Sequence, residues 1–222
     1  VEVRYVSAPR DLGHPDLILL PGSKNTMGDL KWMRTSGMEA SIFKCLKKGT
    51  MIFGICGGYQ MMGERLADPE GTEGGGTMRG MGLLPVETVF HKQKTRTRIQ
   101  GKLEALSGMY EKLSGAAYEG YEIHMGRTML TGEAQVLAKK EEILGVCRGQ
   151  AAGTYIHGIF DSSETADGLL QMLAEKKGLD GAALKGIDFR EYKEKQYQAL
   201  AKGLRESLDM EAIYRMLREV KC

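Results

Sequence analysis

Short runs of apolar residues mark the first third of the chain. The runs Asp16–Leu20, which Pro21 and Gly22 terminate, and Thr50–Phe53 are typical of strands buried on both faces of a parallel sheet. Val1–Val6 alternates apolar and polar side chains instead, which predicts a half-buried strand.

Apolar residues also recur at helical spacing after each of the two buried runs. They predict a helix from Gly28 to Leu46 and another from Tyr59 to Leu66. A strand–helix–strand–helix order is typical of a doubly wound α/β fold, so we expect a mostly parallel sheet flanked by helices.

The rest of the chain predicts further strands and then helices. Residues 68–82, rich in Gly, Glu and Asp, indicate a surface excursion, and Asp209 is placed to cap a final helix. We expect one domain over 1–222, with an α/β core over 1–185 and C-terminal helices over 186–222. The candidate strands are Leu83–Phe90, Arg96–Leu103, Tyr121–His124, Gly145–Cys147 and Gly153–His157. The helical registers are Leu200, Leu204 and Leu208, followed by Ile213, Leu217 and Val220.

Composition narrows the classes of function. The 222 residues carry 31 Lys and Arg against 29 Asp and Glu, and this near-balance gives no general reason to expect a nucleic-acid partner. No uncharged apolar stretch is long enough for a membrane span. The four cysteines form no CxxC pair, so we expect a reducing, cytoplasmic setting and predict no metal site.

Cys56 lies in the pattern G-x-C-x-G, between an apolar run and a helix-like stretch. This is the spacing of a nucleophile elbow, in which Gly54 and Gly58 make room for a strained strand-to-helix turn. Such a turn displays the sulfur at the start of a helix, where we expect a lowered thiol pKa and an oxyanion contact from the N–H of Gly57. The alternative is a buried structural cysteine, which is our interpretation of the other three.

A cysteine nucleophile needs a base, and the chain has four histidines. His157 ends a strand-like run and precedes a glycine, so its side chain is predicted to project from the rim of the sheet, where sites gather in open α/β folds. His14 precedes a proline in a loop and His91 adjoins lysines, so both fit positions without a catalytic role. A strand-end histidine with no catalytic role is the alternative for His157.

Five motifs occur in the same order as in a known family. Together they closely resemble the C-terminal glutaminase domain of the cobyric acid synthases, which are class I glutamine amidotransferases of cobalamin biosynthesis. The resemblance covers nearly the whole chain and implies the flavodoxin-like α/β fold of that class. The motifs are Leu20-Pro-Gly-Ser-Lys-Asn-Thr26, Gly54-Ile-Cys-Gly-Gly-Tyr-Gln60, Gly82-Leu-Leu-Pro85, Gly120-Tyr-Glu-Ile-His124 and Gly153-Thr-Tyr-Ile-His-Gly-Ile-Phe-Asp161.

The resemblance implies a mechanism and a set of site residues. Cys56 would attack the side-chain amide of glutamine, His157 would transfer the protons, and water would hydrolyse the resulting thioester. The oxyanion would bind the N–H groups of Gly57 and of the turn at Gly22 and Ser23. The residues implied to contact glutamine are Gln60, Tyr121, Glu122 and His124.

One position departs from most class I glutaminases, which carry a glutamate two residues after the catalytic histidine. Ile159 stands there in this chain, and its side chain cannot orient an imidazole. We expect Asp161 or a backbone carbonyl to hold the ring of His157, and the isolated glutaminase activity to be modest.

The resemblance also implies a partner domain. The family places an ATP- and Mg-dependent synthetase domain before the glutaminase domain, and no phosphate-cradling G-x-x-x-x-G-K-[ST] motif occurs in this chain. We therefore expect a fragment or an isolated domain without a cofactor of its own. It would deliver ammonia to the synthetase domain and meet the corrinoid substrate only indirectly.

A basic segment alternates charged and neutral side chains. Four cations would share one face if the segment is extended: Lys92, Lys94, Arg96 and Arg98. One interpretation is a solvated strand face. The other is a surface that contacts the synthetase domain or its polycarboxylate substrate.

Two other functions fit parts of the sequence. One is a glutaminase subunit that serves the amidation of a cell-wall precursor, against which the Gly120–His124 motif argues. The other is a regulatory or binding module on an inactive glutaminase fold, against which the retention of Cys56 and His157 argues.

Overall fold

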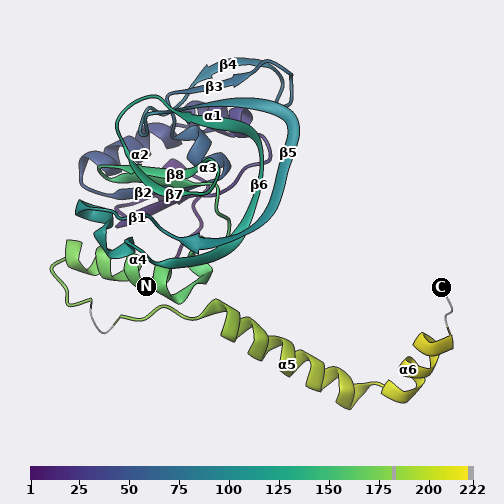
Figure 1. The fold of residues 1–222 in the computed structure, drawn as a ribbon. Helices are drawn as coiled ribbons and strands as arrows, with labels where there is room; N and C mark the ends of the chain where they lie inside the picture. Colours follow the sequence, from purple (N-terminus) through teal and green to yellow (C-terminus); the bar gives the residue numbers. More distant parts are fainter. Residues whose placement is uncertain (182–183, 220–222) are drawn as a thin grey trace. The chain divides into compact units, whose positions relative to one another are not determined.

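The computed structural model describes residues 1–181 and 184–219 (Figure 1). The chain divides into two compact units, Val1–Gly186 and Ile187–Cys222. Within the described residues, no helix is both long and apolar enough to cross a bilayer.

A five-stranded sheet forms the centre of the first unit. Its order is β1 (Leu17–Leu20), β2 (Met51–Ile55), β9 (Ala151–Thr154), β8 (Ile143–Arg148) and β7 (Gln135–Lys139). β1, β2 and β9 are parallel, whereas β8 and β7 each run antiparallel to the neighbour before them. The predicted α/β class is confirmed, but the sheet is mixed rather than mostly parallel.

Apolar clusters cover both faces of this sheet. Adjacent residues of β2 point to opposite faces, because Ile52 belongs to one cluster and Phe53 to the other. The helices on the Ile52 side are α1 (Thr26–Thr35), α2 (Met38–Lys47) and α3 (Gly57–Met61). The elements on the Phe53 side include the 3-10 helix η2 (Gly108–Leu113) and α4 (Ser163–Lys176). This two-sided burial is what the doubly wound pattern predicts.

A second sheet carries a long curved ribbon. Its order is β4 (Gly76–Arg79), β3 (Arg65–Asp68), β5 (Val86–Lys102) and β6 (Ala117–Leu130). β5 and β6 pair antiparallel and curve along one side of the unit (Figure 1). The separate strands predicted at Leu83–Phe90 and Arg96–Leu103 are therefore one strand, since pairing resumes after a register shift between Val89 and Lys94.

Three predictions of local structure are wrong. Val1–Val6 is largely exposed and forms no strand, because no described strand pairs with it. Gly28–Leu46 is two helices, since Gly37 adopts a left-handed φ of 81° between α1 and α2. Tyr59–Leu66 comprises the end of α3 and the start of β3, which begins at Arg65.

Two further differences concern burial and the surface excursion. β1 is an edge strand, so Leu19 is 45% exposed and the strand is not buried on both faces. Residues 68–82 contain β4, which forms a hairpin with β3. Two more 3-10 helices occur in the described part of this unit, η1 (Pro9–Asp11) and η3 (Ile159–Asp161).

The second unit contains the two C-terminal helices, α5 (Phe189–Ser207) and α6 (Met210–Glu219). The predicted cap on the final helix is confirmed, because Oδ1 of Asp209 accepts the N–H of Ala212 at 2.9 Å. Of the residues in the predicted helical registers, Val220 lies outside the described residues, as does Cys222.

Candidate active site

Cys56 occupies a strained turn between β2 and α3. Its φ of 53° is the only positive φ of a residue other than glycine in the described part of the chain. A Cβ on Gly54 would lie 2.6 Å from the backbone nitrogen of Tyr59, and a Cβ on Gly58 would lie 2.2 Å from the carbonyl oxygen of Leu20. Both flanking glycines are therefore sterically required, which explains the G-x-C-x-G pattern.

The turn after β1 brings a second set of backbone groups to this elbow. A Cβ on Gly57 would lie 2.7 Å from the backbone nitrogen of Ser23. A Cβ on Gly22 would lie 3.7 Å from Cβ of Cys56 and 3.1 Å from Cε1 of His157. Gly22 thus stands between the predicted nucleophile and the predicted base, so the structure brings these two distant residues together at one rim of the sheet.

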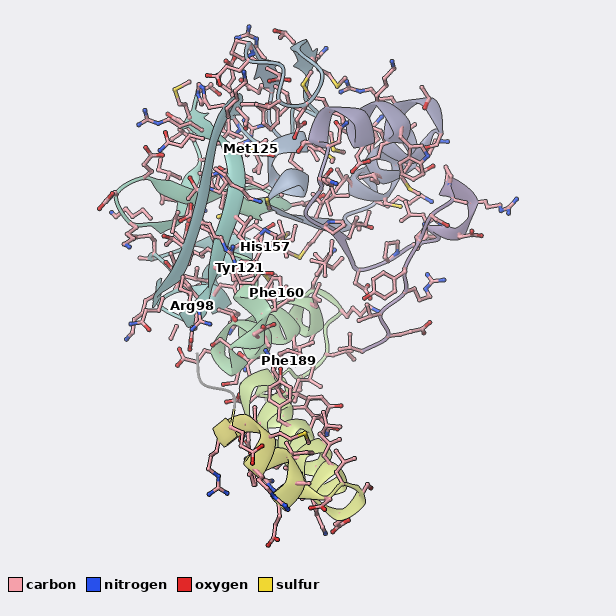
Figure 2. All side chains as sticks on the ribbon, turned by 90° about the vertical axis from the view of Figure 1, so that its right-hand side faces the viewer. Arg98, Tyr121, Met125, His157, Phe160 and Phe189 are labelled. Carbon is pink, nitrogen blue, oxygen red and sulfur yellow. The ribbon has the colours of Figure 1, made fainter. Side chains whose placement is uncertain are left out.

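His157 is held against β6 by Tyr121. Its N–H donates to the carbonyl of Tyr121 at 2.9 Å, and the N–H of Tyr121 donates back at 3.1 Å. The two rings are stacked, with centroids 4.9 Å apart and planes 1° from parallel (Figure 2). Nε2 of His157 is buried and has no hydrogen-bond partner among the described residues. The ring is therefore held in place, while its buried Nε2 has no partner among the described residues and can still accept a proton.

The electrostatics of the pair favour two neutral groups. Burial raises the pKa of the Cys56 thiol to about 11; the N–H of Gly57 opposes this rise, and the charge of Glu73 adds to it. Burial, and then the charge of His124, lowers the pKa of His157 below its ordinary value. The predicted lowering of the thiol pKa is thus wrong for the protein without substrate, because burial outweighs the favourable amide.

The free edge of β6 passes along the whole site. Beyond Tyr121, its Ile123 carbonyl accepts the thiol of Cys56 at 3.3 Å. Two residues further along β6, the carbonyl of Met125 accepts a hydrogen bond from Nε2 of Gln60 at 3.2 Å. The predicted base His157, the predicted nucleophile Cys56 and Gln60 therefore each bind a backbone group along one edge of β6, which fixes their spacing.

Gln60 is 2% exposed and its amide is fully engaged. Besides the Met125 carbonyl, its Nε2 donates to the hydroxyl of Tyr155 at 3.1 Å, and its Oε1 accepts the hydroxyl of Thr26 at 3.1 Å. Both amide hydrogens are used within the protein. Thr26 and Tyr155 are not among the predicted site residues, although both lie inside two of the five sequence motifs.

The other predicted glutamine contacts lie on β6, and the alternation of side chains along the strand places them on two different faces. Tyr121 is 45% exposed and lies on the face of His157. Glu122 and His124 point to the opposite face and bind each other, with 2.9 Å between Oε1 and Nε2. The ring of His124 also stacks on Tyr155, with centroids 3.7 Å apart.

The position that carries a glutamate in most class I glutaminases is apolar here in structure as well as in sequence. Ile159 is 1% exposed and belongs to an apolar cluster, so no carboxylate reaches His157 from this position. The carboxylate of Asp161 lies against Gly158, 3.2 Å from where a Cβ of that residue would stand. Its predicted role toward the imidazole stays a prediction. No group of three or more potential metal ligands occurs among the described side chains.

The basic segment continues the same row of side chains. Arg98 pairs directly with Tyr121 across β5 and β6, so Arg98, Tyr121 and His157 lie side by side on one face (Figure 2). Lys94 and Arg96 share that face and are exposed. Lys92 falls in the stretch of shifted register, so the predicted common face holds for three of the four cations.

Comparison with known proteins places the chain in a family. Residues 1–165 match the CobB/CobQ-like glutamine amidotransferase domain. A cobyric acid synthase of Ruminiclostridium cellulolyticum is 49% identical over 98% of this chain and 44% of its own length. One of Lachnoclostridium phytofermentans is 45% identical over 99% of this chain and 46% of its own length. The chain thus spans less than half the length of these curated relatives.

Solved structures support the fold. A glutamine amidotransferase structure matches with a TM-score of 0.57 at 17% identity, covering 79% of this chain and 87% of its own. A structure of PurLQS from Thermotoga maritima matches with a TM-score of 0.58 at 20% identity, covering 78% of this chain and 85% of its own. Because the domain match covers most of the chain and the relatives are 45–49% identical to it, the chain belongs to the family of CobB/CobQ-like glutamine amidotransferases.

Proposed function

We propose that this chain hydrolyses glutamine to glutamate and ammonia, as the glutaminase part of a cobyric acid synthase. The observation that carries the proposal is the position of Cys56 on a strained elbow. Gly22 lies between Cys56 and His157, and Nε2 of His157 has no hydrogen-bond partner among the described residues. The named relatives, which match nearly the whole chain, support the cobyric acid synthase type.

The first half of the reaction forms a thioester. Nε2 of His157 accepts the thiol proton while the sulfur of Cys56 attacks the amide carbon of glutamine. The N–H of Gly57, with an N–H of Gly22 or Ser23, stabilises the oxyanion of the tetrahedral intermediate. When the carbon–nitrogen bond breaks, the imidazolium returns its proton to the leaving ammonia.

The second half restores the enzyme. The neutral imidazole of His157 removes a proton from water, whose oxygen attacks the thioester, and the thiol of Cys56 leaves with that proton. The sum is one glutamine and one water converted to one glutamate and one ammonia. A lowered pKa of His157 keeps the imidazole neutral, so it is ready to accept a proton at neutral pH.

The remaining predicted residues have different roles in this proposal. Tyr121 positions the imidazole by its stack and its two backbone hydrogen bonds. The engaged amide of Gln60 favours a positioning role over direct contact with glutamine, because both of its hydrogens already have acceptors. Glu122 and His124 form a pair on the inner face of β6, where the ring of His124 stacks on Tyr155.

The ammonia would serve an amidation outside this chain. In the proposed whole enzyme, ATP and Mg²⁺ activate peripheral carboxylates of the corrinoid adenosylcobyrinic acid a,c-diamide in the synthetase domain, and ammonia converts them to amides. This chain would need no cofactor for its own step. An ATP-dependent partner and free cysteines at 45, 56 and 147 fit a cytoplasmic location.

The test compares nitrogen sources in the full-length enzyme. We expect Cys56→Ala to abolish glutamate release and glutamine-dependent amidation, while ammonia-dependent amidation persists. Equal background release of glutamate by the wild type and Cys56→Ala would overturn the proposal and favour an inactive module. Release without corrinoid amidation would assign the glutaminase to another acceptor, such as a cell-wall precursor.

A further inference from the structure

The loop between β3 and β4 is built around one buried carboxylate. Asp68, which is 1% exposed, accepts the N–H groups of Thr72, Glu73 and Gly75 at 2.7–2.8 Å, and also the hydroxyl of Thr72. Burial alone would raise the pKa of Asp68, but these hydrogen bonds lower it to about 2. The loop is therefore held in one conformation rather than left free.

This fixed loop brings the side chain of Glu73 to the first turn of α1. Its Oε2 accepts the N–H of Met27 at 2.9 Å, in the first turn of α1. That turn directly follows residues 22–25, of which Gly22 lies against Cys56 and Ser23 lies against Gly57. The charge of Glu73 is close enough to oppose ionisation of the Cys56 thiol.

The charge of Glu73 lacks a cation. Among the described residues Glu73 forms no ion pair, and its hydrogen-bond donor is the uncharged amide of Met27. Two other carboxylates near the site have polar side-chain partners: Glu122 binds His124, and Asp29 binds the hydroxyl of Ser23. A half-buried carboxylate that opposes the reactive form of the nucleophile is unfavourable unless a cation joins it.

Glutamine brings such a cation. Its α-ammonium group is four bonds from the amide carbon that Cys56 would attack, so a carboxylate beside the nucleophile suits it. Building on the proposed glutaminase function, we propose that Glu73 binds the α-ammonium group of the substrate glutamine. The bound ammonium offsets the negative charge beside Cys56, so the thiol is activated when substrate is present and is less reactive without it.

The test uses two amides that differ only at the α-carbon. The full-length enzyme is assayed with glutamine and with glutaramate, which has the same amide and carboxylate but no α-amino group. We expect the wild type to prefer glutamine by about ten- to a hundredfold in kcat/KM, the range for a hydrogen bond to a charged group. Glu73→Gln should lose this preference by slowing glutamine and leaving glutaramate nearly unchanged.

A matched control lies in the same loop. Glu70 accepts the N–H of Lys92 and contacts His91 on β5, so Glu70→Gln removes the same charge at a different contact, and the preference should persist. An equal loss on both amides in Glu73→Gln would overturn the proposal and leave Glu73 only the hydrogen bond to Met27. An unchanged preference would also overturn it. A wild type that hydrolyses neither amide would refute the glutaminase function itself.

A second readout needs no turnover. Iodoacetamide is uncharged and alkylates the thiolate, so without glutamine Glu73→Gln should be alkylated at Cys56 several-fold faster than the wild type. Glu70→Gln should match the wild type. Alkylation of Glu73→Gln at the wild-type rate would contradict the role of the uncompensated charge.

Discussion

The ring of Tyr121 lies parallel to the imidazole of His157, and the two residues also exchange both of their backbone hydrogen bonds. This contact orients the imidazole from a strand that is distant in the sequence. It provides the constraint that a carboxylate would provide in most class I glutaminases, where this chain has the buried Ile159.

Removing the ring of Tyr121 should therefore slow chemistry more than binding. We expect Tyr121→Ala to lower kcat for glutamate release by about ten- to a hundredfold, because a base that is free to rotate is misplaced for proton transfer. Tyr121→Phe keeps the stack and the backbone bridge, so it should retain most activity. Steady-state kinetics of both variants check this, and a similar loss in the phenylalanine variant would point to the hydroxyl instead.

Gly22 should not tolerate even a methyl group. The added Cβ of Gly22→Ala would lie 3.1 Å from His157 and 3.7 Å from Cβ of Cys56, where the proposed mechanism requires the substrate amide. We expect kcat/KM for glutamine to fall by about a hundredfold or more while the fold persists, as judged by circular dichroism. Gly203→Ala is the control, because nothing lies within 4 Å of its Cβ position. Near-wild-type activity of Gly22→Ala would place the substrate elsewhere.

The parts of the site that the sequence reveals are those with local causes. Gly54 and Gly58 are required by the close packing of the turn around Cys56, and the G-x-C-x-G pattern can therefore be recognised from the sequence alone. The lowered thiol pKa was a wrong expectation because burial of Cys56 depends on distant segments such as β6. Glu73 and Met27, which are 46 residues apart, are joined by a single hydrogen bond that no spacing rule predicts.

The wrong predictions of the fold also concern features that a local apolar pattern does not contain. Alternation in Val1–Val6 predicts a strand, but a strand also needs a neighbour, and none of the described strands supplies one. The middle of β5 is exposed on both faces and therefore lacks the apolar signal of a strand, although it continues the ribbon. Gly37 divides one helical pattern into two helices by its backbone conformation, which apolar spacing does not record.

The pH dependence of hydrolysis should follow the lowered pKa of His157. The imidazole must be neutral to accept the thiol proton, and burial and the charge of His124 both favour the neutral form. The acid limb of kcat/KM should therefore lie below about pH 6.5, the ordinary value of a histidine. His124→Asn removes the charge that contributes to the lowered pKa of His157, and this change favours protonation of His157. The limb should shift to higher pH, and a shift to lower pH would exclude His157 as the titrating base.

The row formed by Arg98, Tyr121 and His157 connects the base to an exposed basic face. Lys94 and Arg96 continue this face along β5. In the proposed enzyme the ammonia must leave the glutaminase site for an acceptor domain that handles carboxylates. A basic surface beside the proposed catalytic histidine is suited to contact an acidic surface of that domain.

Reversing two of these charges should uncouple the two halves of the reaction. In the full-length enzyme we expect Lys94→Glu combined with Arg96→Glu to lower glutamine-dependent amidation by about tenfold or more, because like charges at an interface repel. Ammonia-dependent amidation should stay near the wild-type rate, since it does not need the docked glutaminase. Lys31→Glu with Lys47→Glu makes the same charge change on exposed residues of α1 and α2 and should affect neither assay. Equal loss with both nitrogen sources would argue against docking, because it would mean that the basic face serves the synthetase reaction itself.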